Sequence, residues 1–103
     1  MKACIVITTC SGRKQAETLA KSIIEEKLAA CVQLSDISSF YRWDGKLCHE
    51  DEVKLLIKTR EEFYDQLEKH ISANHEYDLP QIIMLPIAKG SAAYLGWIEE
   101  NTV

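Results

Sequence analysis

The sequence predicts a single α+β domain in which a four-stranded antiparallel sheet carries two helices on one face. Three observations support this prediction. Apolar residues alternate or run continuously in four strand-length segments, one stretch is strongly amphipathic, and Asp44-Gly45 favours a tight turn between two long strands. The 103 residues suit one domain, 1–103, and contain no linker or internal repeat.

The first strand is expected over residues 2–10, where apolar side chains at both parities are typical of an interior strand. Ser11 is expected to cap a helix over residues 13–28. The apolar residues of that helix form a single stripe: Ala16, Leu19, Ala20, Ile23, Ile24 and Leu28.

A long hairpin is expected at the centre of the chain. Its first strand spans residues 31–43, with a bulge near 35–36 or 38–39, and its second spans about 48–58. A hairpin of this length extends beyond a domain of 103 residues, so its outer half needs another surface to pack against.

A second helix is expected from the capping-box spacing of Thr59 and Glu62 to about Ala73. Its predicted inner face consists of Phe63, Leu67, His70 and Ile71. The fourth strand covers residues 81–88, and Pro86 places it at a sheet edge or kinks it. A short helix then starts near residues 90–91 and packs through Tyr94, Leu95, Trp97 and Ile98.

The resulting order, β-α-β-β-α-β-α, is that of a ferredoxin-like sandwich with a C-terminal helix. Two helices cover only one face of such a sheet, yet the first and fourth strands carry large apolar residues at both parities. In a monomer the apolar side chains of the second face would be exposed to water, which is energetically unfavourable. The sequence therefore predicts a homo-oligomer.

Composition narrows the range of partners. The net charge is −4 and no block of lysine and arginine occurs, so neither nucleic acid nor an anionic membrane surface is an expected partner. No apolar run approaches a membrane span. Without an export signal at Met1, we expect a cytoplasmic protein whose four cysteines are reduced, mostly buried thiols.

Spacing alone identifies no reaction. His75 lies in a polar loop where a ligand or a hydrogen bond to backbone would suit it, whereas His70 is expected to be a satisfied, partly buried group. His49 belongs to a charged run near the hairpin turn, which is interpreted as solvated. Asp36 interrupts a strand without forming an acid–base pair, and Ser11-Gly12-Arg13 only weakly suggests an anion site.

Six segments together resemble one family, the CutA divalent-cation tolerance proteins, over essentially the whole chain. They are residues 26–32 (EKLAACV), 39–46 (SFYRWDGK), 52–59 (EVKLLIKT), 75–80 (HEYDLP), 85–87 (LPI) and 90–97 (GSAAYLGW). The resemblance implies a non-enzymatic homotrimer, locked by its hairpins and C-terminal helices. It also implies binding of copper or another divalent metal ion, with no organic cofactor.

The resemblance places the candidate metal ligands at His75 and Cys10. Family members proposed to bind copper use a first-strand cysteine and a His-His pair. Those positions fall at Thr8 and at Asn74-His75 here, so only one histidine is carried over. Nitrogen and sulfur ligands suit copper, and a single histidine needs help from Cys10, Glu76 or a neighbouring subunit.

Two other function classes are considered. A PII-like binding module would take a small anionic ligand in a cleft between subunits, lined by Tyr41, Trp43, Lys58, His75, Tyr77 and Trp97. Burial of the aromatic residues at a subunit interface is the alternative. An acylphosphatase-like hydrolase would need Arg13 and a phosphate-binding loop, and this reading is the least supported.

Overall fold

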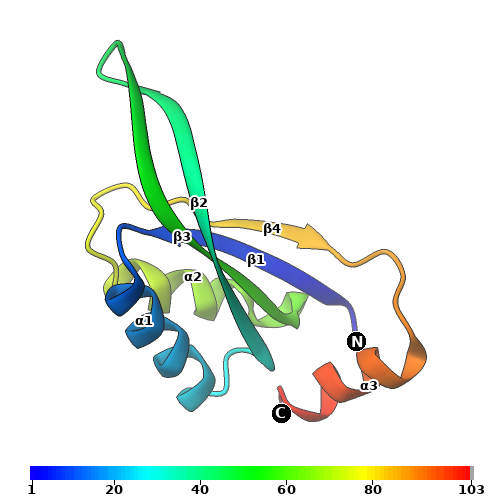
Figure 1. The fold of residues 1–103 in the computed structure, drawn as a ribbon. Helices are drawn as coiled ribbons and strands as arrows, with labels where there is room; N and C mark the ends of the chain where they lie inside the picture. The colour runs from blue at the N-terminus through cyan, green and yellow to red at the C-terminus, as the bar shows by residue number, and fades with distance from the viewer. Residues whose placement is uncertain (103) are drawn as a thin grey trace.

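The computed structural model describes residues 1–102 and has the predicted order of elements (Figure 1). No helix within that range combines the length and apolar character needed to cross a membrane. The elements are β1 (Ala3–Cys10), α1 (Arg13–Glu25), β2 (Cys31–Trp43), β3 (Lys46–Arg60), the 3₁₀ turn η1 (Glu61–Phe63), α2 (Tyr64–Ala73), β4 (Ile83–Pro86) and α3 (Ala92–Glu100).

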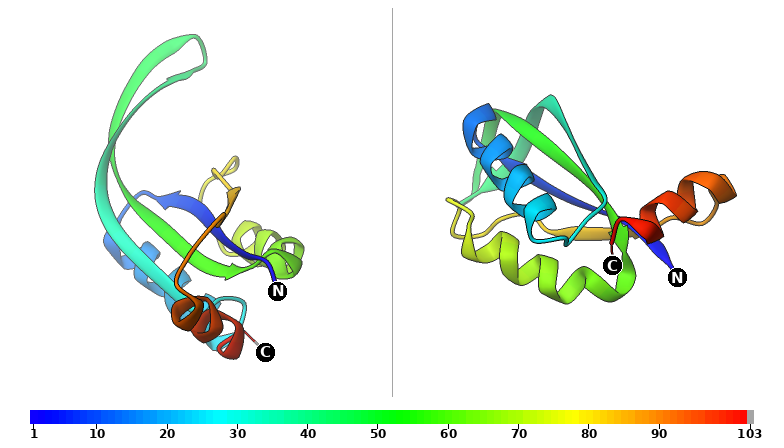
Figure 2. Two further views of the ribbon diagram at one scale, coloured as in Figure 1. Left: turned by 90° about the vertical axis from the view of Figure 1, so that its right-hand side faces the viewer. Right: turned by 90° about the horizontal axis from the view of Figure 1, so that it is seen from below.

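The four strands form one antiparallel sheet in the order β2-β3-β1-β4, which confirms β4 as an edge strand. Helices α1 and α2 lie against the same face of this sheet (Figure 2). The β2–β3 hairpin extends well past the rest of the domain, and the longest dimension of the molecule is 44 Å (Figure 1).

The hairpin is continuous. Its register runs without an extra residue from Cys31 opposite Lys58 to Trp43 opposite Lys46, so the predicted bulge is wrong. The turn is as predicted, because Asp44 and Gly45 have φ angles of 53° and 73°, the left-handed values that a two-residue turn requires.

The core lies between the sheet and the two helices. Leu19 and Ile23 of α1 and Leu67 and Ile71 of α2 are buried, as predicted, whereas Ile24 is 42% exposed. Strand side chains complete the buried core: Cys4, Val6, Cys10, Val53, Leu55 and Ile57. The alternation of β1 and β3 positions these residues on the helix-covered face.

Helix α1 ends three residues earlier than the sequence predicts. Lys27 adopts φ 59°, and the N–H of Leu28 donates to the Ile23 carbonyl at 3.0 Å while the N–H of Lys27 donates to the Ile24 carbonyl at 3.0 Å. This pair of bonds is a Schellman termination. It satisfies the last carbonyls and turns the chain toward β2.

Two predicted helix caps are wrong because their side chains bond to distant residues instead. The Ser11 hydroxyl donates to the Glu76 carboxylate, and α1 begins after Gly12 without a side-chain cap. The Thr59 hydroxyl donates to the Leu28 carbonyl at 2.8 Å, and Glu62 accepts from Arg60 rather than from Thr59. Tertiary contacts therefore override local capping signals.

The second face of the sheet is apolar and uncovered, as predicted. Ile7 of β1 lies between Leu56 of β3 and Ile83 of β4, and Ile5 lies beside Leu85. Ile83 is 46% exposed and Leu85 is 45% exposed in one chain. We call these five residues the open face.

Thr8→Val is expected to stabilise the fold. Thr8 is fully buried, and its hydroxyl has no hydrogen-bond partner among residues 1–102. Valine keeps the shape and removes the unsatisfied group, a gain of about 1 kcal/mol in the free energy of unfolding. Urea denaturation would measure it.

Thr59→Val is the matched control for this change. Thr59 is equally buried, but its hydroxyl donates to the Leu28 carbonyl, so the same exchange is expected to destabilise by about 1 kcal/mol. A loss of stability in both variants would contradict the prediction for Thr8.

Candidate functional site

His75 is held at both ring nitrogens. Its Nε2 lies 2.7 Å from the Thr9 carbonyl oxygen, and the Tyr77 N–H donates to its Nδ1 at 3.0 Å. Because a carbonyl can only accept and an amide N–H can only donate, the ring must be neutral with its proton on Nε2. His75 thus ties the loop after α2 to the end of β1.

Cys10 is the nearest sulfur to this ring. Its Sγ lies 3.9 Å from His75 Nε2 and its side chain is buried. Burial, and then the negative charges of Glu76 and Glu52, raise the pKa of the Cys10 thiol to about 11. At neutral pH the sulfur is therefore a protonated thiol.

The two candidate ligands do not fit a metal ion as they are arranged. Copper would need a thiolate and a free lone pair on the ring. The Nδ1 lone pair of His75 is used by Tyr77, and its Nε2 carries a proton for Thr9. Within residues 1–102 there is also no group of three or more His, Cys, Asp or Glu side chains placed to hold a metal ion.

The remaining histidines and Asp36 have structural contacts. His70 lies 2.8 Å from the Ser22 hydroxyl, which confirms it as a satisfied group between the helices. His49 stacks on Phe40 across the hairpin, with ring centroids 4.1 Å apart and planes within 4°. Asp36 lies inside the continuous strand β2 and pairs with Arg13 at 2.6 Å.

Three predicted cleft residues lie together. Tyr41 and Trp43 occupy alternate positions of β2, and Tyr77 joins them from the loop after α2. The Tyr77 hydroxyl donates to the Glu52 carboxylate at 2.9 Å, which fixes the loop beside the hairpin. The space between loop and hairpin has a volume of about 880 Å³, and we call it the hairpin groove.

Lys58 and Trp97 lie apart from this groove, because Lys58 is near the opposite end of β3 and Trp97 belongs to α3. The Lys58 ammonium donates to the Tyr94 hydroxyl at 3.1 Å and sits 5.1 Å from the centre of its ring. Tyr94 in turn stacks on Trp97 with centroids 5.6 Å apart. In one chain, the predicted cleft residues therefore form two separate groups.

Sequence reasoning missed the carboxylates of the groove. Glu50 lies opposite Ser39 and Glu52 opposite Ile37, so both share the hairpin face that carries Tyr41 and Trp43. The sequence suggested only a solvated acidic run. Pairing residues outward from the two-residue Asp44-Gly45 turn gives this register. That pairing could have placed Glu50 and Glu52 on the face of Tyr41 and Trp43 from the sequence alone.

Comparison with known proteins places the chain in a family. The family model described as CutA1 divalent ion tolerance protein matches residues 4–101. The chain belongs to the CutA1 family. This membership confirms the resemblance found in the sequence.

Relatives and solved structures of the CutA1 family agree with this assignment. "Protein CutA, chloroplastic" of Arabidopsis thaliana is 46% identical over 95% of this chain and 54% of its own length. The divalent-cation tolerance protein CutA of Thermus thermophilus is 40% identical over 95% of this chain and 96% of its own. The crystal structure of CutA1 from Oryza sativa has a TM-score of 0.96 at 44% identity and covers 100% of this chain and 95% of that one. The chain thus spans about half the length of the Arabidopsis protein.

Proposed function

We propose that this chain is the subunit of a homotrimeric, non-catalytic divalent-cation tolerance protein with a ferredoxin-like sandwich. The observation that carries the proposal is the open face, where Ile83 and Leu85 are almost half exposed to water in one chain, beside an overlong hairpin. Covering such a surface gains about 25 cal/mol per Å². Membership in the CutA1 family supports a role in divalent-cation tolerance.

The state of Cys10 supports a non-catalytic role. A nucleophilic cysteine is exposed and carries a lowered pKa. Cys10 is buried and its thiol pKa is raised to about 11. His75 lies near its sulfur, but the proton on His75 Nε2 is directed to the Thr9 carbonyl, so the ring does not act as a base toward the thiol.

Binding of copper or another divalent ion at His75 is expected to be weak. The ring would have to give up its bond to Thr9 or to Tyr77, and the Cys10 thiol would have to lose its proton. A cytoplasmic location is proposed on the four free cysteines, which suit a reducing compartment.

A copper titration of the reduced protein by calorimetry, wild type beside His75→Asn, tests metal binding. Asparagine removes the imidazole but can still accept from the Tyr77 N–H, because a side-chain oxygen bonding two residues onward is the usual Asx turn. Because both ring nitrogens are engaged, we expect a dissociation constant no tighter than about a millimolar in the wild type. Micromolar binding that the variant weakens about tenfold, about 1.4 kcal/mol, would instead make His75 a ligand.

Identical isotherms in the two proteins would show that His75 does not bind copper. Thermal unfolding followed by circular dichroism serves as the control, because His75→Asn also removes the bond to Thr9. A variant that keeps its fold yet loses copper affinity would identify His75 as a ligand rather than as a structural tie.

A further inference from the structure

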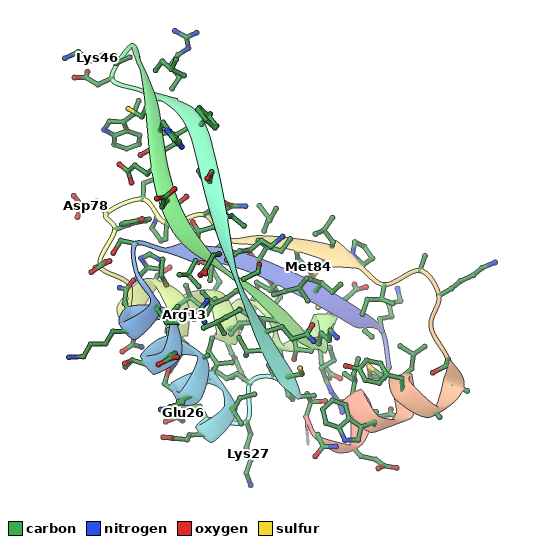
Figure 3. All side chains as sticks on the ribbon, in the orientation of Figure 1. Arg13, Glu26, Lys27, Lys46, Asp78 and Met84 are labelled. Atoms are coloured by element: carbon green, nitrogen blue, oxygen red, sulfur yellow. The ribbon has the colours of Figure 1, made fainter. Side chains whose placement is uncertain are left out.

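The outer half of the hairpin has a second surface, on the side of the sheet that the helices cover. Asp36 of β2 pairs with Arg13 of α1 at 2.6 Å, so this position of β2 faces the helices. Residues at alternate positions of a strand share a face, so Phe40 and Arg42 continue this side toward the turn. Figure 3 shows Lys46 at the tip of the hairpin, far from the helices, which therefore leave the outer half uncovered.

This surface lies outside the assembly proposed above. Leu56 of the open face has the opposite parity on β3 to Val53, whose side chain is buried beneath the helices. Across the hairpin, His49 and Leu47 of β3 share the parity of Val53. Covering the open face with other copies therefore does not cover them. The residues that we call the outer hairpin face are Phe40, Arg42, Leu47, His49 and Asp51.

The centre of the outer hairpin face is apolar and exposed. The rings of Phe40 and His49 stack with centroids 4.1 Å apart and planes within 4° of each other, so they present one flat aromatic surface. Phe40 is nevertheless 68% exposed, and Leu47 is 80% exposed. Large apolar side chains grouped in this way beside a preformed aromatic stack are typical of a contact surface.

The charges of the outer hairpin face are divided between its two ends. Arg42 lies two residues from Phe40 in the direction of the turn. Asp51 lies two residues from His49 in the opposite direction, and its carboxylate accepts from the Ser38 hydroxyl at 3.4 Å. Among residues 1–102, neither Arg42 nor Asp51 has an ion-pair partner. The stacked pair therefore separates one unpaired cation from one unpaired anion.

The acidic end of the outer hairpin face borders a hollow at the start of α1. The hollow has a volume of about 520 Å³, and Asp51 is one of its three lining carboxylates. Of the other two, Asp36 pairs with Arg13. Glu52 accepts from the Tyr77 hydroxyl. The Asp51 carboxylate is therefore the one available to a cation, and the hollow has room for an arginine side chain.

We propose that the outer hairpin face binds the same face of a second copy of this chain, antiparallel about a two-fold axis through the Phe40–His49 stack. Arg42 and Asp51 lie equally far from this stack on opposite sides of it. The axis therefore brings Arg42 of each copy to Asp51 and the hollow of the other. One surface supplies both halves of the contact, with the rings and Leu47 at its centre, and this self-complementarity is the property of an isologous interface.

The contact is additional to the proposed trimer. It uses the opposite side of the sheet, so it joins assembled molecules to one another. It involves few side chains, and interfaces of that size are weak. We expect a dissociation constant of about 0.1–1 mM for one pair of hairpins. At low micromolar concentration the contact therefore leaves the assembly through the open face unchanged.

Sedimentation equilibrium at chain concentrations from about 10 μM to about 1 mM tests the contact by charge reversal. We expect the wild-type mass to rise with concentration. Arg42→Asp and Asp51→Arg should each weaken the association at least about fivefold, because like charges then face each other at both ends. An equal mixture of these two variants should associate about as tightly as the wild type, since each supplies the charge that the other lacks.

Lys21→Asp is the matched control. It changes the net charge by the same amount as Arg42→Asp, at an exposed position of α1, and should associate as the wild type does. Phe40→Ser tests the centre of the contact and is expected to weaken association at least about fivefold. Circular dichroism should show an unchanged fold in each variant, because every substituted side chain is exposed.

Three results would overturn the proposal. These are a wild-type mass that does not change with concentration, single charge-reversal variants that associate as tightly as the wild type, and a mixture that associates no better than its components. The assembly through the open face is measured at low micromolar concentration, so failure of the hairpin contact leaves that proposal standing.

Discussion

Replacing Ile7 with lysine is expected to convert the proposed trimer into a monomer. Ile7 lies at the centre of the open face, between Leu56 and Ile83, and points away from the helix-covered core. An ammonium group there would be buried without a partner in each copy of the assembly, which costs several kcal/mol per subunit. In the separated chain the same lysine lies in water, so the fold should survive.

Sedimentation velocity provides the measurement. The wild type should sediment with three times the 11.7 kDa mass of one chain, and Ile7→Lys with the mass of one. Circular dichroism would verify that the monomer is folded.

Ile24→Lys is the control for this experiment, because it makes the same exchange at an exposed site of α1 on the other side of the sheet. It should remain trimeric. A wild type that sediments as a monomer, or an Ile7→Lys protein that stays trimeric, would refute the assembly through the open face.

Replacing Arg60 with alanine is expected to cost about 2 kcal/mol in the free energy of unfolding and to loosen α3. The Arg60 Nε donates to the Thr102 hydroxyl at 2.9 Å, and one terminal nitrogen donates to the Glu99 carbonyl at 2.8 Å. The other terminal nitrogen pairs with Glu62, which is 63% exposed while the Arg60 side chain is 13% exposed. That exposed pair contributes little, so the two bonds to the end of α3 dominate the loss.

Hydrogen exchange distinguishes loss of docking from a general loss of stability. In Arg60→Ala we expect the amides of α3 to exchange much faster, while those of β1 and β3 exchange only as the global stability requires. In Arg60→Lys we also expect fast exchange of the α3 amides. The single ammonium group of lysine cannot reproduce the planar guanidinium geometry that donates to both Thr102 and Glu99.

Arg42→Ala removes the same side chain from an exposed position near the hairpin turn, and it should change stability by less than about 0.5 kcal/mol. If the amides of α3 exchange no faster than those of the sheet in Arg60→Ala, the variant has lost stability uniformly. That result would contradict the role of Arg60 as an anchor for α3.

The position of the metal candidates shows where sequence reasoning about the site ends. The sequence singles out His75 and Cys10, and the Cys10 Sγ lies 3.9 Å from the His75 Nε2. Whether the His75 ring has a free nitrogen depends on the Thr9 carbonyl and the Tyr77 amide. Both are backbone groups, and no pattern of residues in the sequence predicts where they lie. The protonation of His75 is therefore a property of the fold.

By itself the sequence determined the order of elements, the tight turn at Asp44-Gly45, the core faces of α1 and α2 and the apolar second face of the sheet. These features follow from periodicity and turn chemistry, which act over a few residues. Only the tertiary structure decided that Ser11 and Thr59 bond to distant partners, that β2 runs without a bulge, and that acidic and aromatic side chains share the hairpin groove. Those outcomes depend on contacts between residues far apart in the chain, whose energies exceed the local preferences they replace.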